Sequence, residues 1–175
     1  MKLDEKDLHI LSLLLKNGRA KYTLIARSLS KAMSESVPDT TVLFRIRKLK
    51  KSGVIKRFTA SLDPEALGYT VYGVILAEIG GHILHDISVE HTRKIKADFE
   101  SRSNVIFVAL DQNETGIFAL VLGRQTSDVE DIFNSLKDNP DVVDAKMWLL
   151  RPPTKGDSLI GTAVPLDKVE AVSDV

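Results

Sequence analysis

The sequence lacks cysteine altogether, has a single tryptophan, and only 6% of its 175 residues are aromatic. Without cysteine there is no disulfide, no thiolate metal cluster and no cysteine nucleophile, so the chain does not depend on an oxidising compartment. Long apolar runs are also missing, and stretches such as Ile10–Leu15 and Val105–Leu110 are far shorter than the roughly 18 residues of a membrane span. Met1 to Glu5 lack the apolar stretch of a signal peptide. We therefore expect a soluble, cytoplasmic protein with no membrane partner.

Net charge is absent as well, because 24 basic residues balance 24 acidic ones. The balance hides an uneven distribution along the chain. Residues 1–62 contain 14 basic and 5 acidic side chains, a net charge of +9, and residues 63–175 therefore carry −9. Such an asymmetry is typical of chains whose basic part contacts nucleic acid. It also predicts a domain boundary near residue 60.

Three short helices are predicted in the basic part. Leu3–Lys16 and Tyr22–Leu29 carry apolar residues at helical spacing, and acidic residues in the first turn of Leu3–Lys16 complement its dipole. After the polar stretch Ser30–Asp39, a third helix ends at Gly53 and has one apolar stripe, formed by Val42, Ile46 and Leu49. Three short helices of which the last is basic favour a helix-turn-helix unit.

The third helix leaves hydroxyl, aromatic and basic side chains outside its apolar stripe. Every charge from Arg45 to Arg57 is positive, and no acidic residue lies at i±4 to pair with it, whereas a helix face that only meets water mixes both signs. We predict that this helix contacts double-stranded DNA through Thr40, Thr41, Phe44, Arg45, Arg47, Lys48 and Lys51. Replacing Arg45 and Lys48 by alanine should then weaken DNA binding strongly and leave thermal stability nearly unchanged.

The remaining residues predict a hinge followed by an α+β domain. Val54–Leu62 is rich in β-forming residues, and Asp63–Gly68 is typical of a turn with a short helical piece. Alternating strand and helix patterns follow at Tyr69–Ile79, His91–Phe99, Val105–Leu110, Ile117–Leu122, Val129–Leu136 and Val142–Leu150. The order βαββαβ is the ferredoxin-like motif. Its helices cover one face of a four-stranded sheet, and dimerisation through the sheet is the simplest way to cover the other.

These segments resemble the Lrp/AsnC (feast/famine) family of transcriptional regulators. The resemblance lies in LDEKDLHILSLLLKNGRAKYTLIARSL and TTVLFRIRKLKKSGVIKRFTASLDPEALG. It implies a helix-turn-helix DNA-binding domain over residues 1–53, a hinge over 54–68, a ferredoxin-like ligand-sensing and dimerisation domain of the RAM type over 69–151, and a C-terminal tail over 152–175. It further implies a sequence-specific transcriptional regulator that forms a homodimer or higher oligomer, needs no cofactor, and responds to an amino acid or another small metabolite.

Two places depart from the family's pattern. The stretch before the third helix is several residues longer than usual, and Phe44 stands where an arginine is common, so we expect an unusual operator preference. The family's Gly-Asp-aromatic-Asp sequence is matched here by Gly116-Ile117-Phe118-Ala119, which lacks both acids and so weighs against amino-acid binding. If an effector binds, its expected site is the loop that contains Asp111, Asn113, Thr115 and Gly116, and the alternative is a plain hairpin turn.

The remaining polar residues raise two other functions, a metal site and an enzyme active site. A group of possible metal ligands matches no zinc-finger or HExxH spacing, so no metal site is predicted; it comprises His82, His85, Asp86, Glu90 and His91. The two-domain plan is also similar to that of the sirohaem decarboxylases, where histidines and Arg93 would line a tetrapyrrole pocket. The uncompensated basic helix argues against an enzyme. The tail is expected to be either an arm that reaches a neighbouring subunit or a loosely docked end.

Overall fold

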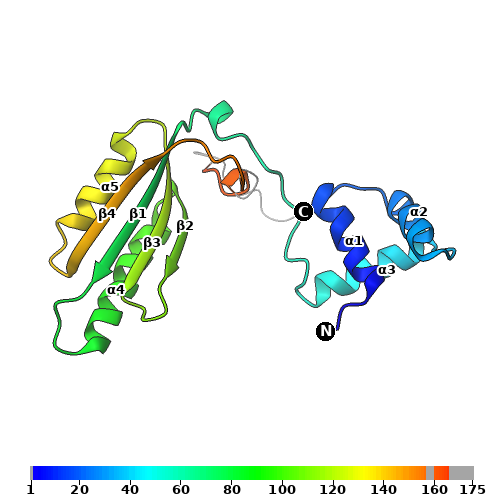
Figure 1. The fold of residues 1–175 in the computed structure, drawn as a ribbon, viewed down its shortest axis with the longest axis horizontal. Helices are drawn as coiled ribbons and strands as arrows, with labels where there is room; N and C mark the ends of the chain where they lie inside the picture. Colours follow the sequence, from blue (N-terminus) through cyan, green and yellow to red (C-terminus); the bar gives the residue numbers. More distant parts are fainter. Residues whose placement is uncertain (1, 157–159, 166–175) are drawn as a thin grey trace. The chain divides into compact units, whose positions relative to one another are not determined.

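The computed structural model describes residues 2–156 and 160–165. The chain divides into two compact units, residues 1–59 and 60–175, and the division falls inside the predicted hinge. The first unit is helical and the second contains a sheet with two helices (Figure 1). No helix among the described residues is both long and apolar enough to cross a membrane.

The first unit consists of three helices, α1 (Glu5–Lys16), α2 (Tyr22–Met33) and α3 (Asp39–Lys51). α1 begins at a capping box, in which the Asp7 N–H donates to the Asp4 carboxylate (2.8 Å) and the Asp4 N–H donates to the Asp7 carboxylate (3.3 Å). The apolar stripes of the helices meet in one core that contains Ile10, Ile25, Leu29, Val42, Ile46 and Leu49, each at most 2% exposed. This core holds α3 with one face inward and the opposite face in solvent.

α2 is longer than predicted, because it continues from Leu29 through Met33. Nothing between these residues breaks a helix, and Met33 packs against the core. The connection to α3 is therefore residues 34–38, and half of the apparently long stretch Ser30–Asp39 is helical. Ser34 closes α2 in the left-handed region (φ 54°), and the hydroxyl of Ser30 accepts a hydrogen bond from the Val37 N–H (2.9 Å).

The β-rich segment Val54–Leu62 does not form a strand. A strand is stable only when a neighbouring strand or a packed face supports it, and here the Leu62 N–H donates instead to the Gly161 carbonyl (2.8 Å). The predicted short helical piece is present as a 3₁₀ turn, Glu65–Leu67. Gly68 ends that turn with φ 85°, a conformation that L side chains rarely adopt.

The second unit has a four-stranded antiparallel sheet in the order β2-β3-β1-β4. Its elements are β1 (Val71–Ile79), α4 (His85–Ser101), β2 (Val105–Leu110), β3 (Gly116–Gly123), α5 (Ser127–Lys137) and β4 (Val142–Leu150). This confirms the predicted βαββαβ order, although α4 begins six residues earlier than the predicted His91. α4 and α5 cover one face of the sheet (Figure 1), and between them lies a core that includes Ile75, Ile117, Phe99, Val129 and Ile132.

Gly73 of β1 provides a test of this packing. A Cβ at this position would lie 2.3 Å from Cγ1 of Val129 on α5, closer than two carbon atoms can approach. We expect Gly73→Ala to lower the free energy of unfolding of the second unit by about 1–3 kcal/mol, because the close-packed interface must open. Adding Val129→Ala removes the clashing methyl groups. The loss of unfolding free energy in the double variant should therefore be smaller than the sum of the losses in the two single variants. Urea unfolding of the four proteins measures this, and simple additivity would contradict the proposed contact.

The outer face of the sheet, opposite the helices, is partly covered by the described end of the tail. Ile160 and Val164 are buried against Tyr69, Tyr72 and Leu122. The Tyr69 hydroxyl donates to the Pro165 carbonyl (3.2 Å). Residues 160–165 thus dock on their own subunit, whereas residues 166–175 of the predicted tail lie outside the described residues.

Candidate nucleic-acid interface and sensing loop

The exposed face of α3 unites five of the seven residues predicted to contact DNA. These residues follow one another at i, i+4, i+7, i+8 and i+11, which places them on one side of a helix. That side lies opposite the buried stripe of α3, and all five side chains are exposed. We name this set the α3 face; it consists of Thr40, Phe44, Arg47, Lys48 and Lys51.

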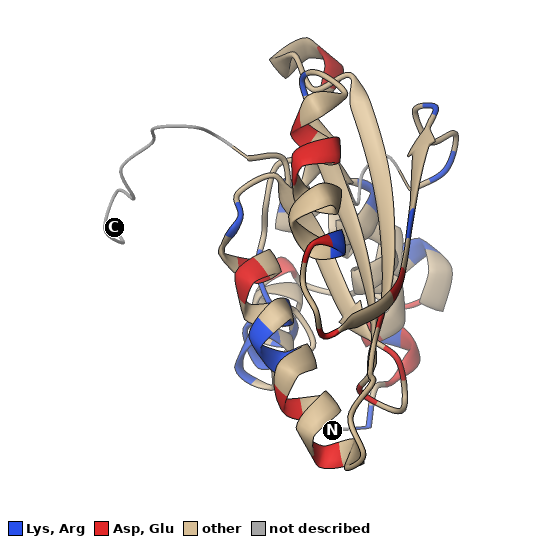
Figure 2. Ribbon diagram, turned by 90° about the vertical axis from the view of Figure 1, so that its left-hand side faces the viewer, with Lys and Arg blue, Asp and Glu red and all other residues tan. Residues whose placement is uncertain are grey.

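The charged residues of the α3 face and of the segment that follows it are all positive. All 14 basic side chains of residues 1–62 lie within residues 1–59. In the rest of the chain, acidic residues outnumber basic ones (Figure 2). Lys50, Lys56 and Arg57, which neighbour or follow the α3 face in sequence, are exposed as well. Phe44 is 67% exposed, although a large apolar side chain usually turns inward. A cationic surface with an exposed aromatic ring is chemically suited to phosphates and base edges.

Arg45, predicted to contact DNA, is instead held inside the first unit. Its Nη1 lies 2.7 Å from the Asp4 carboxylate and 2.8 Å from the Asp7 carboxylate. The Asp7 side chain is only 7% exposed, and the Arg45 side chain is 25% exposed. Arg45 therefore fastens α3 to the capped end of α1. As predicted, no acidic residue lies at i±4 on α3 to pair with its basic residues. Arg45 nevertheless has acidic partners on another helix, which the spacing could not indicate because Asp4 and Asp7 are distant in sequence.

Because of this ion pair, the expected effect of replacing Arg45 on thermal stability changes. Its loss would leave the buried Asp7 carboxylate without its cationic partner, so a variant that lacks Arg45 should lose stability rather than keep it. Asp4 shares in the pairing, and its pKa lies below the usual value because the Asp7 N–H donates to its carboxylate and Arg45 binds it. Thr41, also in the predicted set, is half-buried and lies outside the α3 face.

The loop proposed for an effector folds around Asp111. Its Oδ1 accepts hydrogen bonds from the backbone N–H groups of Thr115 (3.0 Å) and Gly116 (2.9 Å). The Asp111 N–H donates to the Gly116 carbonyl (2.9 Å). The two amides that could bind a ligand carboxylate are thus occupied by a carboxylate of the chain itself. Asp111, Asn113, Thr115 and Gly116 border a hollow of about 290 Å³, whose other walls are Leu76, Ala77, Glu78, Asp144 and Lys146.

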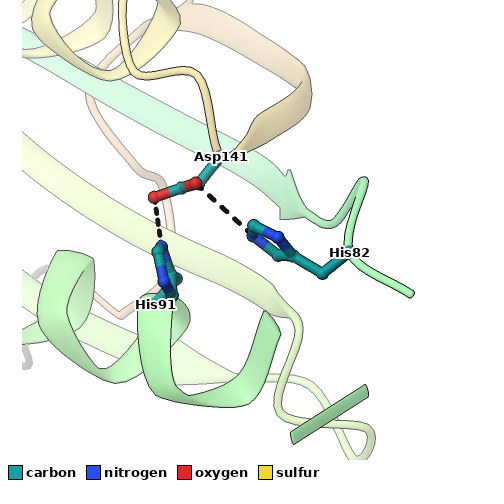
Figure 3. A group of neighbouring side chains, drawn as sticks. All are labelled: His82, His91 and Asp141. Atoms are coloured by element: carbon teal, nitrogen blue, oxygen red, sulfur yellow. Dashed lines mark hydrogen bonds and ion pairs between the residues drawn. The ribbon is translucent and has the colours of Figure 1, made fainter. Parts of the chain in front are cut away.

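Two of the histidines considered for a metal site come together in the structure. His82 and His91 lie beside Asp141, a residue absent from the predicted group because it is 50 positions from His91 (Figure 3). His85, Asp86 and Glu90 are exposed. No spacing in the sequence brings Asp141 into this group, because its place is set by the turn between α5 and β4.

Comparison with known proteins agrees with these features. The search for a matching family profile found none. Among curated proteins, the HTH-type transcriptional regulator FL11 of Pyrococcus horikoshii is 44% identical over 77 residues, so the match spans about half of each protein, 44% of this chain and 47% of FL11. The HTH-type transcriptional regulator PF0864 of Pyrococcus furiosus is 30% identical over 161 residues, which cover 91% of this chain and 94% of PF0864.

Solved structures show the same architecture over the whole chain. The structure of PF0864, described as a member of the AsnC family, matches with a TM-score of 0.79 and 26% identity, and the match covers 94% of this chain and 100% of PF0864. The regulator NMB0573 of Neisseria meningitidis, solved in complex with L-Met, has the same fold with a TM-score of 0.68 and 18% identity, covering 95% and 98% of the two chains. These relatives are transcriptional regulators and not decarboxylases. The chain belongs to the Lrp/AsnC family of helix-turn-helix transcriptional regulators.

Proposed function

We propose that the protein regulates transcription by inserting α3 into the major groove of duplex DNA. The observation that carries this proposal is the α3 face, five exposed side chains aligned opposite the buried stripe. Arg47 is suited to bidentate contact with guanine or a phosphate, and Lys48 and Lys51 to phosphates. Phe44 is suited to the methyl group of thymine. An aromatic contact of this kind supports an operator preference unlike that of relatives with arginine there.

Specific binding is tested with genomic fragments that the purified protein retains. Anisotropy titrations at several salt concentrations should show affinity for a retained fragment about 10³-fold or more above that for an unrelated duplex. The logarithm of the binding constant should fall linearly with the logarithm of salt concentration, because lysine and arginine displace counterions from phosphates. Equal affinity for retained and unrelated duplexes would contradict sequence-specific regulation.

Dimerisation through the sheet is supported by an apolar surface on the outer face. Leu76, Phe107, Phe118 and Trp148 are 38–46% exposed, and we name them the outer patch. Leu76 pairs with Phe118 across β1 and β3, and the Phe107 and Phe118 rings meet edge to face with centroids 5.9 Å apart. Aromatic residues gathered on one exposed face are typical of protein–protein interfaces. A dimer would bring two α3 helices to one operator, with half-sites about one or more DNA turns apart.

A charge in the outer patch should break the dimer. We expect Phe118→Glu or Trp148→Glu to produce monomers at micromolar concentration, because association would bury an unpaired carboxylate. Light scattering coupled to size exclusion measures the mass of each variant. Ile83→Glu is the matched control, since Ile83 is a fully exposed apolar residue of the same unit outside the patch. A wild-type mass for both patch variants would exclude this face as the interface.

We further propose that an amino acid acts as the effector of this regulator. NMB0573, which shares the fold, has been solved with L-Met, and the hollow beside Asp111 is of a size to hold one amino acid. Glu78 and Asp144 line it and are suited to an ammonium group, and Lys146 to a carboxylate. Because Asp111 occupies the amides of Thr115 and Gly116, a ligand carboxylate must displace it or bind Lys146. Calorimetric titration with each of the twenty amino acids tests this, and no heat from any of them would exclude an amino-acid effector.

A further inference from the structure

A cluster of two histidines and one aspartate is built from three separate elements of the second unit. His82 follows β1, His91 lies in α4, and Asp141 lies in the turn that precedes β4. The carboxylate of Asp141 faces both rings, with one oxygen in contact with His91 Nδ1 and the other 3.4 Å from His82 Nε2 (Figure 3). One ligand atom from each residue lies within 4.8 Å of the other two.

The backbone holds all three residues in place. The Asp141 N–H donates to the side-chain oxygen of Asn139 (3.0 Å), and the Asp141 carbonyl accepts from the Gly80 N–H (3.0 Å). Gly81 has φ 80°, which allows the chain to turn after β1 toward His82. His91 is fixed by a helix whose next residue, Thr92, is fully buried. The arrangement thus does not depend on flexible side chains alone.

The cluster contains a polar atom without a hydrogen-bond partner. His82 Nε2 is buried, and among the described residues it makes no hydrogen bond, since the geometry to Asp141 does not suit one. Buried polar atoms are nearly always satisfied, and an exception indicates an ion or water that belongs there. The two imidazole rings are tilted with centroids 4.8 Å apart, and one nitrogen of each ring faces the Asp141 carboxylate.

We propose that His82, His91 and Asp141 bind a divalent transition-metal ion of the zinc class. Two imidazoles and one carboxylate are a common ligand set for Zn²⁺, whereas Ca²⁺ and Mg²⁺ prefer oxygen ligands throughout. Ligand atoms around a tetrahedral zinc ion are about 3.4 Å apart, close to the separation between His82 and Asp141. His91 and Asp141 would exchange their direct contact for bonds to the ion. The fourth position is left to water or another ligand.

Such an ion would stabilise the end of the sheet that carries the loop from Asp111 to Gly116. His82 follows β1 by a few residues, and the last residue of that strand, Ile79, donates its N–H to the Thr115 carbonyl (2.9 Å). On α4, Arg93 lies two residues after His91 and pairs with Glu114 of the same loop (2.8 Å). Metal binding would therefore order the two elements against which the loop from Asp111 to Gly116 rests. This gives the protein a second ligand class, distinct from amino acids.

Titration of the full chain with Co²⁺ tests the site, because tetrahedral cobalt absorbs visible light and Zn²⁺ should displace it. We expect one ion per chain, and at least about tenfold weaker binding in His82→Ala and in Asp141→Asn. His85→Ala is the matched control, since His85 is an exposed histidine of the same segment, and it should bind like wild type. Zn²⁺ should also raise the unfolding temperature of wild type and of His85→Ala only.

Three results would overturn the proposal. These are the absence of visible bands, wild-type affinity in both ligand variants, and an equal loss in His85→Ala. Circular dichroism of each variant without metal checks that it folds. Should one ligand variant fail to fold, the other still decides the question, because His82 and Asp141 lie on different elements.

Discussion

Replacing Arg47 and Lys48 together by alanine is expected to weaken binding to the operator at least about 30-fold and to leave thermal stability unchanged. Each side chain projects from the α3 face into solvent, so its removal takes no contact from the core. A guanine or phosphate contact is worth about 1–3 kcal/mol, and two such losses give the expected factor. Anisotropy titration measures the affinity, and the salt dependence should become shallower because fewer counterions are released.

The matched control removes two positive charges elsewhere. Lys137 and Lys155 are exposed and belong to the second unit, so their replacement by alanine changes the net charge by the same amount. If that variant lost as much affinity as the α3 variant, binding would reflect overall charge and not a recognition helix. A large fall in the unfolding temperature of the α3 variant would likewise contradict the exposed position of these side chains.

Arg45→Ala is expected to lower the free energy of unfolding of the first unit by about 2–3 kcal/mol. The change leaves Asp7 buried without a cationic partner and cuts the link between α3 and α1. A fully buried pair would cost more, but the Asp4 carboxylate and part of the guanidinium are exposed to solvent. Arg45→Lys should recover part of the loss, because both carboxylates contact the single nitrogen Nη1 and an ammonium group carries three donors on one nitrogen.

Urea unfolding followed by helical circular dichroism measures the effect. Arg47→Ala is the control on the same helix, because Arg47 lies only two residues after Arg45 but on the exposed face, and it should unfold like wild type. The double variant Arg45→Met with Asp7→Leu should be more stable than Arg45→Ala, because it leaves no buried charge unpaired. Full stability of Arg45→Ala would show that the ion pair contributes nothing to the fold.

Acid should weaken the same contact. The pKa of Asp4 is lower in the folded chain than its usual value, first because of the Asp7 N–H and then because of Arg45. A carboxylate of this kind stabilises the fold fully above its unfolded pKa of about 3.9, and the contribution is lost as pH falls through the lower folded pKa. The first unit should therefore lose stability below about pH 4, and less steeply in Asp4→Asn, whose cap does not titrate.

The order of the elements and the division of charge between the two units could be predicted from the sequence alone. Strands such as Val105–Leu110 and Val142–Leu150 lie where the apolar pattern predicts them, because apolar and β-branched residues gather in segments that a sheet buries. The buried stripe of Val42, Ile46 and Leu49 in turn predicts which face of α3 meets solvent. Helical periodicity is a local property, so one sequence was sufficient for the fold class and for most of the α3 face.

Which charged and polar groups meet could not be predicted, because it depends on how the elements pack. Arg45 pairs with carboxylates 38 and 41 positions away, and His91 meets Asp141 from 50 positions away. Asp111 takes the amides of its own loop, and Ile160 returns to the outer face of the sheet. The spacing of apolar residues in the sequence does not indicate such partners, because they depend on the angles between packed helices and strands. An arginine on a basic helix therefore has the same local pattern whether it binds DNA or, as Arg45 does, holds two helices together.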